Sequence, residues 1–208
     1  MTSVRHNMPE RDGSGRAAST DAVLDAARDC VLAVGVRRTT LTDIARRAGV
    51  SRMTLYRRWP DVRTIVGDLM TREWLELALS VVDESGGDAR TRLVDTLVAG
   101  TRTFREHPLL RKIVDVDPEL FLPYLLTRAG MSQLAFLDLI EGEIVRGHED
   151  GSIRPGSAAL QARALLLIVQ GFALSLPTMT DEERPEEGLT ADAFDLELRL
   201  ILDRALSP

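Results

Sequence analysis

Residues 40–59 have the sequence TLTDIARRAGVSRMTLYRRW and contain two short helical patterns that meet at a tight turn. Thr40 and Asp43 have the spacing of a capping box, in which a hydroxyl accepts an unpaired N–H at the start of a helix. Gly49 stands where that helix would end at positive φ, and Ser51 supplies the next N-cap. The stretch therefore predicts a helix-turn-helix, whose second helix can enter the major groove of DNA.

The second helical pattern has a buried side and an exposed side. Val50 and Leu55 occupy the two positions of a hydrophobic staple, and Leu55 and Trp59 are expected to pack inward. On the other side, arginine can donate two hydrogen bonds to guanine, and apolar groups can contact a thymine methyl. The residues expected to contact DNA bases or phosphates are Thr42, Arg52, Met53, Thr54, Tyr56, Arg57, Arg58 and Arg63.

The distribution of charge agrees with a DNA-binding N-terminal part. The 208-residue chain has a net charge of −6, which taken alone argues against a nucleic-acid binder. Residues 1–64, however, contain 12 arginines and 7 acidic residues, whereas residues 65–208 contain 14 basic and 25 acidic ones. We infer a basic head that contacts phosphates and an acidic body that does not.

A first helix is predicted over residues 20–34, with Gly35 at its C-terminal end. From this helix through TTLTDIARRAGVSRMTLYRRWPD, the sequence resembles the DNA-binding domain of the tetracycline-repressor (TetR) family, over about residues 20–66. The resemblance combines the Thr-x-x-Asp-Ile-Ala cap, the Ala-Gly-Val-Ser turn, the Thr-Leu-Tyr segment and an aromatic residue followed by proline. The lysine common in the family two residues after that proline is Val62 here, so one phosphate contact is missing unless Arg63 replaces it.

Beyond this stretch the sequence predicts further helices and no strand, which gives an all-α chain of about nine helices. We expect a disordered tail over residues 1–18, a helix-turn-helix domain over 19–64 and a ligand-binding and dimerisation domain over 65–208. The body helices are predicted over residues 61–83, 90–106, 109–116, 119–148 with a bend near Gly130, 157–176 and 190–206.

The helix predicted over residues 157–176 is apolar nearly all round, which is typical of a helix buried on most sides. Its longest apolar run, residues 164–176, is expected to be too short to span a bilayer. The TetR resemblance implies that the last two long helices form a four-helix bundle across a two-fold axis, although a monomer with an internal helix is the alternative. The expected interface residues are Ala162, Leu166, Gly171, Ala173, Ala193, Leu196, Leu200 and Ile201.

The same resemblance implies a pocket for a small-molecule effector within the body, between the helices of residues 61–148. The side chains there favour a hydrophobic effector, although each is also typical of ordinary core packing. The residues expected to line the pocket are Trp74, Phe104, Phe121, Tyr124, Arg128, Met131 and Phe136.

Other chemistry has little support in the sequence. Cys30 is the only cysteine, so an intrachain disulfide is impossible, and no cofactor or metal site is predicted. Asp115, Asp117 and Glu119 are close in sequence but lack histidine or cysteine partners, so we expect them on solvated faces. The N-terminus lacks the apolar core of a signal peptide, which favours a cytoplasmic protein without a membrane segment.

These patterns favour a homodimeric transcriptional regulator rather than an enzyme. We expect it to repress transcription from a near-palindromic double-stranded DNA operator and to be released by a small, apolar effector. One alternative is a helix-turn-helix regulator that is independent of ligand and controlled by a protein partner. Another is a helical enzyme that uses the helix-turn-helix only as scaffold.

Overall fold

The computed structural model describes residues 19–82, 86–181, 183–184 and 187–208. The tail predicted over residues 1–18 lies outside these ranges. Within them the chain forms ten α-helices and no strand, so the all-α prediction is confirmed, with one helix more than expected. In chain order the helices are α1 (Thr20–Val34), α2 (Leu41–Ala48), α3 (Arg52–Arg58), α4 (Val62–Ser80), α5 (Ala89–Glu106), α6 (Pro108–Val116), α7 (Leu122–Leu126), α8 (Met131–Glu149), α9 (Ala158–Ser175) and α10 (Ala191–Leu206).

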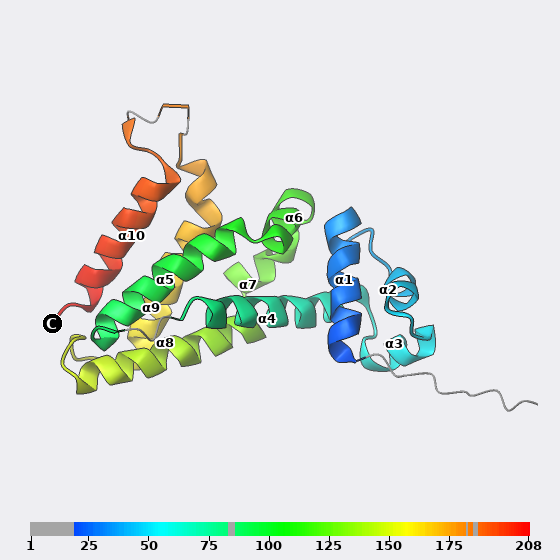
Figure 1. The fold of residues 1–208 in the computed structure, drawn as a ribbon, viewed down its shortest axis with the longest axis horizontal. Helices are drawn as coiled ribbons and strands as arrows, with labels where there is room; N and C mark the ends of the chain where they lie inside the picture. The colour runs from blue at the N-terminus through cyan, green and yellow to red at the C-terminus, as the bar shows by residue number, and fades with distance from the viewer. Residues whose placement is uncertain (1–18, 83–85, 182, 185–186) are drawn as a thin grey trace, which may run out of the picture.

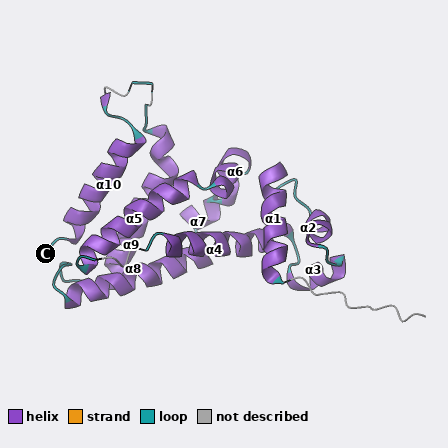
Figure 2. Cartoon of the chain, viewed as in Figure 1, coloured by secondary structure: helices purple, strands orange, loops and turns teal. Residues whose placement is uncertain are grey.

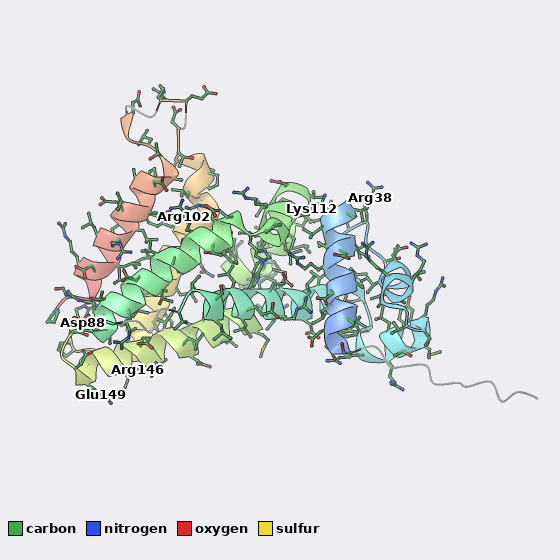
Figure 3. All side chains as sticks on the ribbon, viewed as in Figure 1. Arg38, Asp88, Arg102, Lys112, Arg146 and Glu149 are labelled. Atoms are coloured by element: carbon green, nitrogen blue, oxygen red, sulfur yellow. The ribbon has the colours of Figure 1, made fainter. Side chains whose placement is uncertain are left out.

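The head consists of α1, α2 and α3 at one end of the molecule, and α4 leads from it into the body (Figure 1). The body is a layered set of helices in which α5, α8, α9 and α10 surround a second core (Figure 2). Figure 3 shows the acidic residues Asp88 and Glu149 at the end of the body away from the head. The basic head and the body with its acidic excess are thus different parts of an elongated chain, with the head at one end.

Local capping explains the short helices of the head. The Thr40 hydroxyl accepts a hydrogen bond from the Asp43 N–H at 3.1 Å, and the Ser51 hydroxyl accepts one from the Thr54 N–H at 3.1 Å. Gly49 has φ 68°, the left-handed conformation that glycine adopts without steric cost. The Asp43 carboxylate accepts from the Thr40 hydroxyl at 2.6 Å, whereas a full capping box would use the Thr40 backbone N–H.

One apolar cluster joins the head to the body. It contains Leu24 from α1, Ile44 from α2, Leu69 from α4 and Ile113 from α6, and these side chains are almost completely buried. The boundary predicted after residue 64 therefore does not coincide with a gap between two cores. Burial of this size is the main source of stability in a domain, so we expect head, α4 and α6 to fold as one unit.

A buried carboxylate pins the loop between α1 and α2 to the C-terminal end of α6. Asp117 is fully buried and accepts a hydrogen bond from the Val36 N–H at 2.7 Å, while Arg37 lies 3.5 Å away. Gly35 has φ 83°, and an added Cβ would lie 2.8 Å from a Val116 methyl group. The expectation of a solvated face is thus wrong for Asp117, because the fold places the head loop over it.

Residues 119–148 do not form the single bent helix that was predicted. A 3₁₀ turn, Pro118–Leu120, is followed by the short α7, and α8 begins only at Met131. Pro123 lies in the first turn of α7, where its missing N–H is tolerated. The Gln133 side chain accepts from the Gly130 N–H at 2.8 Å and so starts α8 anew. The remaining predicted helices are close to the observed ones.

The α9 helix is longer than its apolar core suggests. With the following 3₁₀ turn it forms the stretch Ala158–Thr178, 21 residues that are long and apolar enough to cross a membrane by length and composition alone. The apolar run of residues 164–176 is shorter than a span, but the whole helix with its 3₁₀ turn reaches the necessary length. Only 28% of its apolar window is buried within the chain. The core helix of a soluble protein passes the same test, so this criterion alone assigns no membrane segment.

Candidate DNA-binding surface and ligand cavity

The α3 helix presents one face to solvent because the other is held in the core of the head. Leu55 and Trp59 are 1% and 3% exposed, and the indole N–H of Trp59 donates to Asp68 on α4 at 2.8 Å. On the outer face, Met53 is 78% exposed and Tyr56 is 50% exposed. Met53 and Tyr56 are three residues apart on this helix, so both side chains are accessible on its outer face.

The residues predicted to contact DNA differ in the exposure of their side chains and in their hydrogen bonds within the protein. Arg52 and Arg57 are exposed on α3, and Arg63 is exposed at the start of α4. Thr42 is half-buried on α2, and the Thr54 hydroxyl bonds to that of Ser51 at 2.8 Å. Their contacts with DNA stay predictions.

The Arg58 side chain has contacts within the head that the sequence did not predict. It bonds to the Thr20 hydroxyl, and its guanidinium carbon lies 4.7 Å from the centroid of the Trp59 ring. These contacts link α3 to the start of α1, so Arg58 has a structural role within the head. Arg46 and Arg47 are likewise held in ion pairs, with Asp43 and Asp29 respectively.

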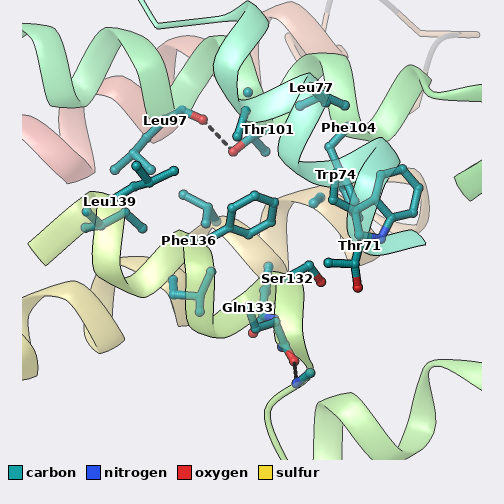
Figure 4. Close-up of a pocket in the computed structure, with 18 of the residues that line it drawn as sticks. Thr71, Trp74, Leu77, Leu97, Thr101, Phe104, Ser132, Gln133, Phe136 and Leu139 are labelled. Atoms are coloured by element: carbon teal, nitrogen blue, oxygen red, sulfur yellow. Dashed lines mark hydrogen bonds between the residues drawn. The ribbon is translucent and has the colours of Figure 1, made fainter. Parts of the chain in front are cut away.

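The body contains a cavity of about 860 Å³ between α4, α5, α7, α8 and α9 (Figure 4). This volume is within the range of drug-sized ligand sites, which bury most of the ligand in mainly apolar walls. All seven residues predicted to line a pocket lie in its wall: Trp74, Phe104, Phe121, Tyr124, Arg128, Met131 and Phe136. The aliphatic part of the wall was not foreseen, because a Leu or Val in a helix looks the same whether it faces a core or a cavity.

Aromatic side chains connect the cavity wall to the junction between α5 and α6. Trp74 packs edge-on against Phe104, with ring centroids 4.7 Å apart, and against His107, with centroids 5.1 Å apart. His107 lies outside the wall and accepts from the Leu109 N–H at 3.3 Å through Nδ1, which caps α6. Burial lowers the pKa of His107, so its neutral form is favoured.

The residue before Trp74 on α4, Glu73, contacts the head. Its carboxylate is buried, and it accepts from Arg28 of α1 at 3.0 Å and lies 3.5 Å from His107 Nε2. Glu73 and Trp74 are adjacent in sequence, yet one contacts α1 and the other lines the cavity. A shift of α4 at this point would therefore change both regions.

Comparisons with known proteins agree with the geometry of the head. Residues 23–66 match the family model described as bacterial regulatory proteins, tetR family. The chain is 37% identical over 155 residues to the uncharacterized HTH-type transcriptional regulator Rv2250c of Mycobacterium tuberculosis, a match that covers 74% of this chain and 80% of that protein. The chain belongs to the TetR family. It is a DNA-binding transcriptional regulator with a helix-turn-helix.

Solved structures with the TetR fold resemble nearly the whole chain. The transcriptional repressor QsdR from R. erythropolis, a TetR-family protein, superposes with a TM-score of 0.65 at 17% identity, over 91% of this chain and 96% of that one. A SmeT–triclosan complex superposes with a TM-score of 0.55 at 21% identity, over 88% and 90% of the two chains. At such low identity the likeness concerns the fold alone.

In this TetR-family chain, the α9 helix has three apolar faces. Ala162 and Leu165 are buried in the second core, and Leu166 and Ala173 line the cavity. Leu160 and Leu167 are 69% and 71% exposed, on the side of α9 that also carries Ala164 and Gly171. The sequence therefore looks apolar all round although the three faces meet a core, a cavity and solvent.

The predicted interface residues are split between these faces. The interface prediction is wrong for Ala162 and Ala173, because side chains buried within one chain have almost no surface to offer a second subunit. Leu166 is half-buried in the cavity wall. Gly171 is exposed on α9, and Ala193 is half-buried on α10. On α10 the exposed members of the predicted set are Leu196, Leu200 and Ile201.

Leu160 and Leu167 were missed by the sequence prediction. Their spacing with Ala164 and Gly171 is that of a continuous helical stripe, which the sequence does contain. Several such stripes exist on a helix apolar all round, so the pattern alone did not select this one.

Proposed function

We propose that this protein is a cytoplasmic, homodimeric transcriptional repressor that leaves its operator when a small, largely apolar effector fills the body cavity. The observation that carries the proposal is the pairing of two features in one chain. The α3 helix exposes Arg52, Met53, Tyr56 and Arg57 from a rigid head, and the body holds a cavity of about 860 Å³.

The exposed stripes of α9 and α10 support a dimer. Leu160 and Leu167 of α9 and Leu196 of α10 are each more than half exposed, and a second subunit would cover them. A two-fold axis would pair each stripe with its own copy. Two α3 helices would then contact successive major grooves, roughly 34 Å apart, in a near-palindromic site.

The named relatives agree with this scheme. QsdR is described as a transcriptional repressor, and SmeT was solved as a complex with triclosan. For this chain we infer the same two properties, repression and effector binding, by a shift between two populations of the dimer. Effector contact with Trp74 would displace α4, and Glu73 on the same helix would carry the displacement to Arg28 of α1.

The proposal is tested by selecting binding sites from random duplex DNA and measuring affinity by fluorescence anisotropy at two salt concentrations. We expect salt-dependent binding to a near-palindrome, because phosphate contacts release counterions. Arg52→Ala should lose roughly 1–3 kcal/mol of operator binding and relax the preference at one base position. Arg111→Ala, on the exposed side of α6, is the matched control.

A thermal-shift screen of apolar compounds then identifies ligands, which should raise the Tm of the dimer. Each ligand is added to the protein–operator complex, and we expect release. Operator binding that persists with every cavity ligand would favour the ligand-independent regulator controlled by a protein partner. Absence of sequence-specific DNA binding would refute the repressor.

A further inference from the structure

Five charged side chains line the cavity among the described residues, and four of them have partners within the protein. Asp68 accepts from the Trp59 indole, and Glu143 bonds to Arg146 and lies 3.6 Å from Arg92. The fifth is Arg128, whose guanidinium carbon lies 5.5 Å from the centroid of the Tyr124 ring. Among the residues that the structure describes, no carboxylate pairs with Arg128.

Two hydroxyl groups share this part of the wall with Arg128. They belong to Tyr124 on α7 and Ser132 in the first turn of α8, and in the described ranges neither hydroxyl has a hydrogen-bond partner. Gln133 fixes the connection between α7 and α8, because it accepts from the Gly130 N–H at 2.8 Å and donates to the Tyr124 carbonyl at 3.3 Å. The three free donors are thus held on one short, cross-linked segment.

The cavity changes character along its length. Figure 4 shows Ser132 and Gln133 on one side and Leu97 and Leu139 on the other, with the Phe136 ring between them. A ligand that extends from the first side to the second meets hydrogen-bond donors at one end and aliphatic side chains at the other. This arrangement is complementary to an amphiphile and not to a uniformly apolar molecule.

We propose that the cavity binds an amphiphile with a single carboxylate, with the carboxylate at Arg128, Tyr124 and Ser132 and the apolar part toward Leu97 and Leu139. A guanidinium supplies the one positive charge that a carboxylate needs, and the two hydroxyls can donate further charge-assisted hydrogen bonds to its oxygens. A phosphomonoester carries about −1.5 to −2 at neutral pH, which would exceed the single positive charge of Arg128. The inference deepens the proposed effector site and depends on that proposal only for the site's regulatory role.

The test compares dodecanoate with dodecan-1-ol, which have the same chain and differ in the charged head. Binding of each to the full-length protein is measured by isothermal titration calorimetry, below the concentration at which the probes aggregate. We expect dodecanoate to bind about tenfold more tightly, since hydrogen bonds to charged groups are strong but this arginine is exposed to solvent.

Variants of one residue assign the preference to Arg128. Arg128→Gln should bind the acid and the alcohol equally, and Arg128→Lys should keep part of the preference because it keeps the charge. Arg111→Gln, which removes an exposed guanidinium outside the cavity wall, should behave as the unmodified protein does. Since Arg128 is exposed, these substitutions should leave the Tm nearly unchanged.

Three results would overturn the inference: equal affinity for acid and alcohol in the unmodified protein, an unchanged preference in Arg128→Gln, or no binding of either probe. The proposed function is tested separately, by adding each probe to the protein–operator complex. Operator release by both probes with equal affinities would remove the carboxylate assignment and leave the repressor standing. Preferential binding of the acid without operator release would support the carboxylate assignment and refute the proposed release of the repressor by its effector.

Discussion

The head positions its functional residues through interactions that are short in sequence, whereas the body positions them through helices far apart in the chain. In α3, the cap at Ser51 and the inward side chains Leu55 and Trp59 lie within nine residues of one another and together determine the exposed face. In α9, the same apolar residue types face a core, a cavity and solvent within one helix. Local chemistry thus defines the exposed face of α3, whereas in α9 it does not tell which apolar face meets the core, the cavity or solvent.

This difference has a functional consequence for a regulator. The surface predicted to contact DNA is set by local caps and turns, and the head that presents it shares its apolar core with α4 and α6. The cavity and the proposed dimer face depend on how six helices pack, so small displacements there can change the spacing of the two heads. The following predictions test how separate the two regions are, from the largest expected effect to the smallest.

The proposed dimer face should be the surface most sensitive to charge. Leu167→Glu would place an unpaired carboxylate in a buried interface, at a cost of roughly 3–5 kcal/mol. We expect a monomer by light scattering and loss of binding to the paired half-sites, with a nearly unchanged helical content. Val114→Glu, at a similarly apolar but separate position on α6, is the control, and a dimer in both variants would place the interface elsewhere.

Truncation of the shared core should destabilise head and body together. Leu69 is fully buried in the cluster that joins α1, α2, α4 and α6. Leu69→Ala should lower the free energy of unfolding by roughly 2–5 kcal/mol, from lost burial and the cavity that remains. Circular dichroism should show a single thermal transition at a lower Tm. Two separate transitions would mean that a boundary near residue 64 divides two independently stable units.

The buried Asp117 should contribute through the hydrogen bond that it accepts from the head loop. Asp117→Ala leaves the Val36 N–H buried without an acceptor, which costs roughly 1–3 kcal/mol. Asp117→Asn retains an acceptor oxygen and should lose less. Chemical denaturation of the two variants measures the difference, and equal losses would show that the charge rather than the bond is what matters.

The smallest expected effect concerns pH and His107. Burial lowers the pKa of His107 in the folded state, so between the folded and unfolded values the unfolded chain binds more protons. Its contribution to stability is therefore present above the ordinary histidine pKa of about 6.5 and is lost as the pH falls below it. Protonation of Nδ1 would also remove the acceptor that caps α6.

In His107→Asn, the amide oxygen can still accept from the Leu109 N–H but cannot titrate in this range. We expect the decline in Tm on acidification to become shallower in this variant, and stability at higher pH to change little. An identical pH dependence in both proteins would show that His107 does not titrate between the folded and unfolded states.

Much of the head could be predicted from sequence because its determinants are local. The N-caps Thr40 and Ser51 and the glycine at 49 each act within four residues, so their spacing carries the information. The pocket aromatics followed from the resemblance to the TetR family rather than from the residue pattern, because each ring is also typical of core packing. Asp117 was misassigned because its partner, Val36, lies 81 residues away.

By itself, the sequence determined the all-α class, the two capped helices at residues 40–59 and the basic character of the N-terminal part. The tertiary structure alone decided that Arg58 is held within the head, that α7 and α8 are separate helices, and that Leu160 and Leu167, rather than Ala162 and Ala173, lie on the open side of α9. Caps and turns act over one helical turn and leave a residue pattern, whereas the choice among equivalent apolar faces depends on which distant helix packs against each one.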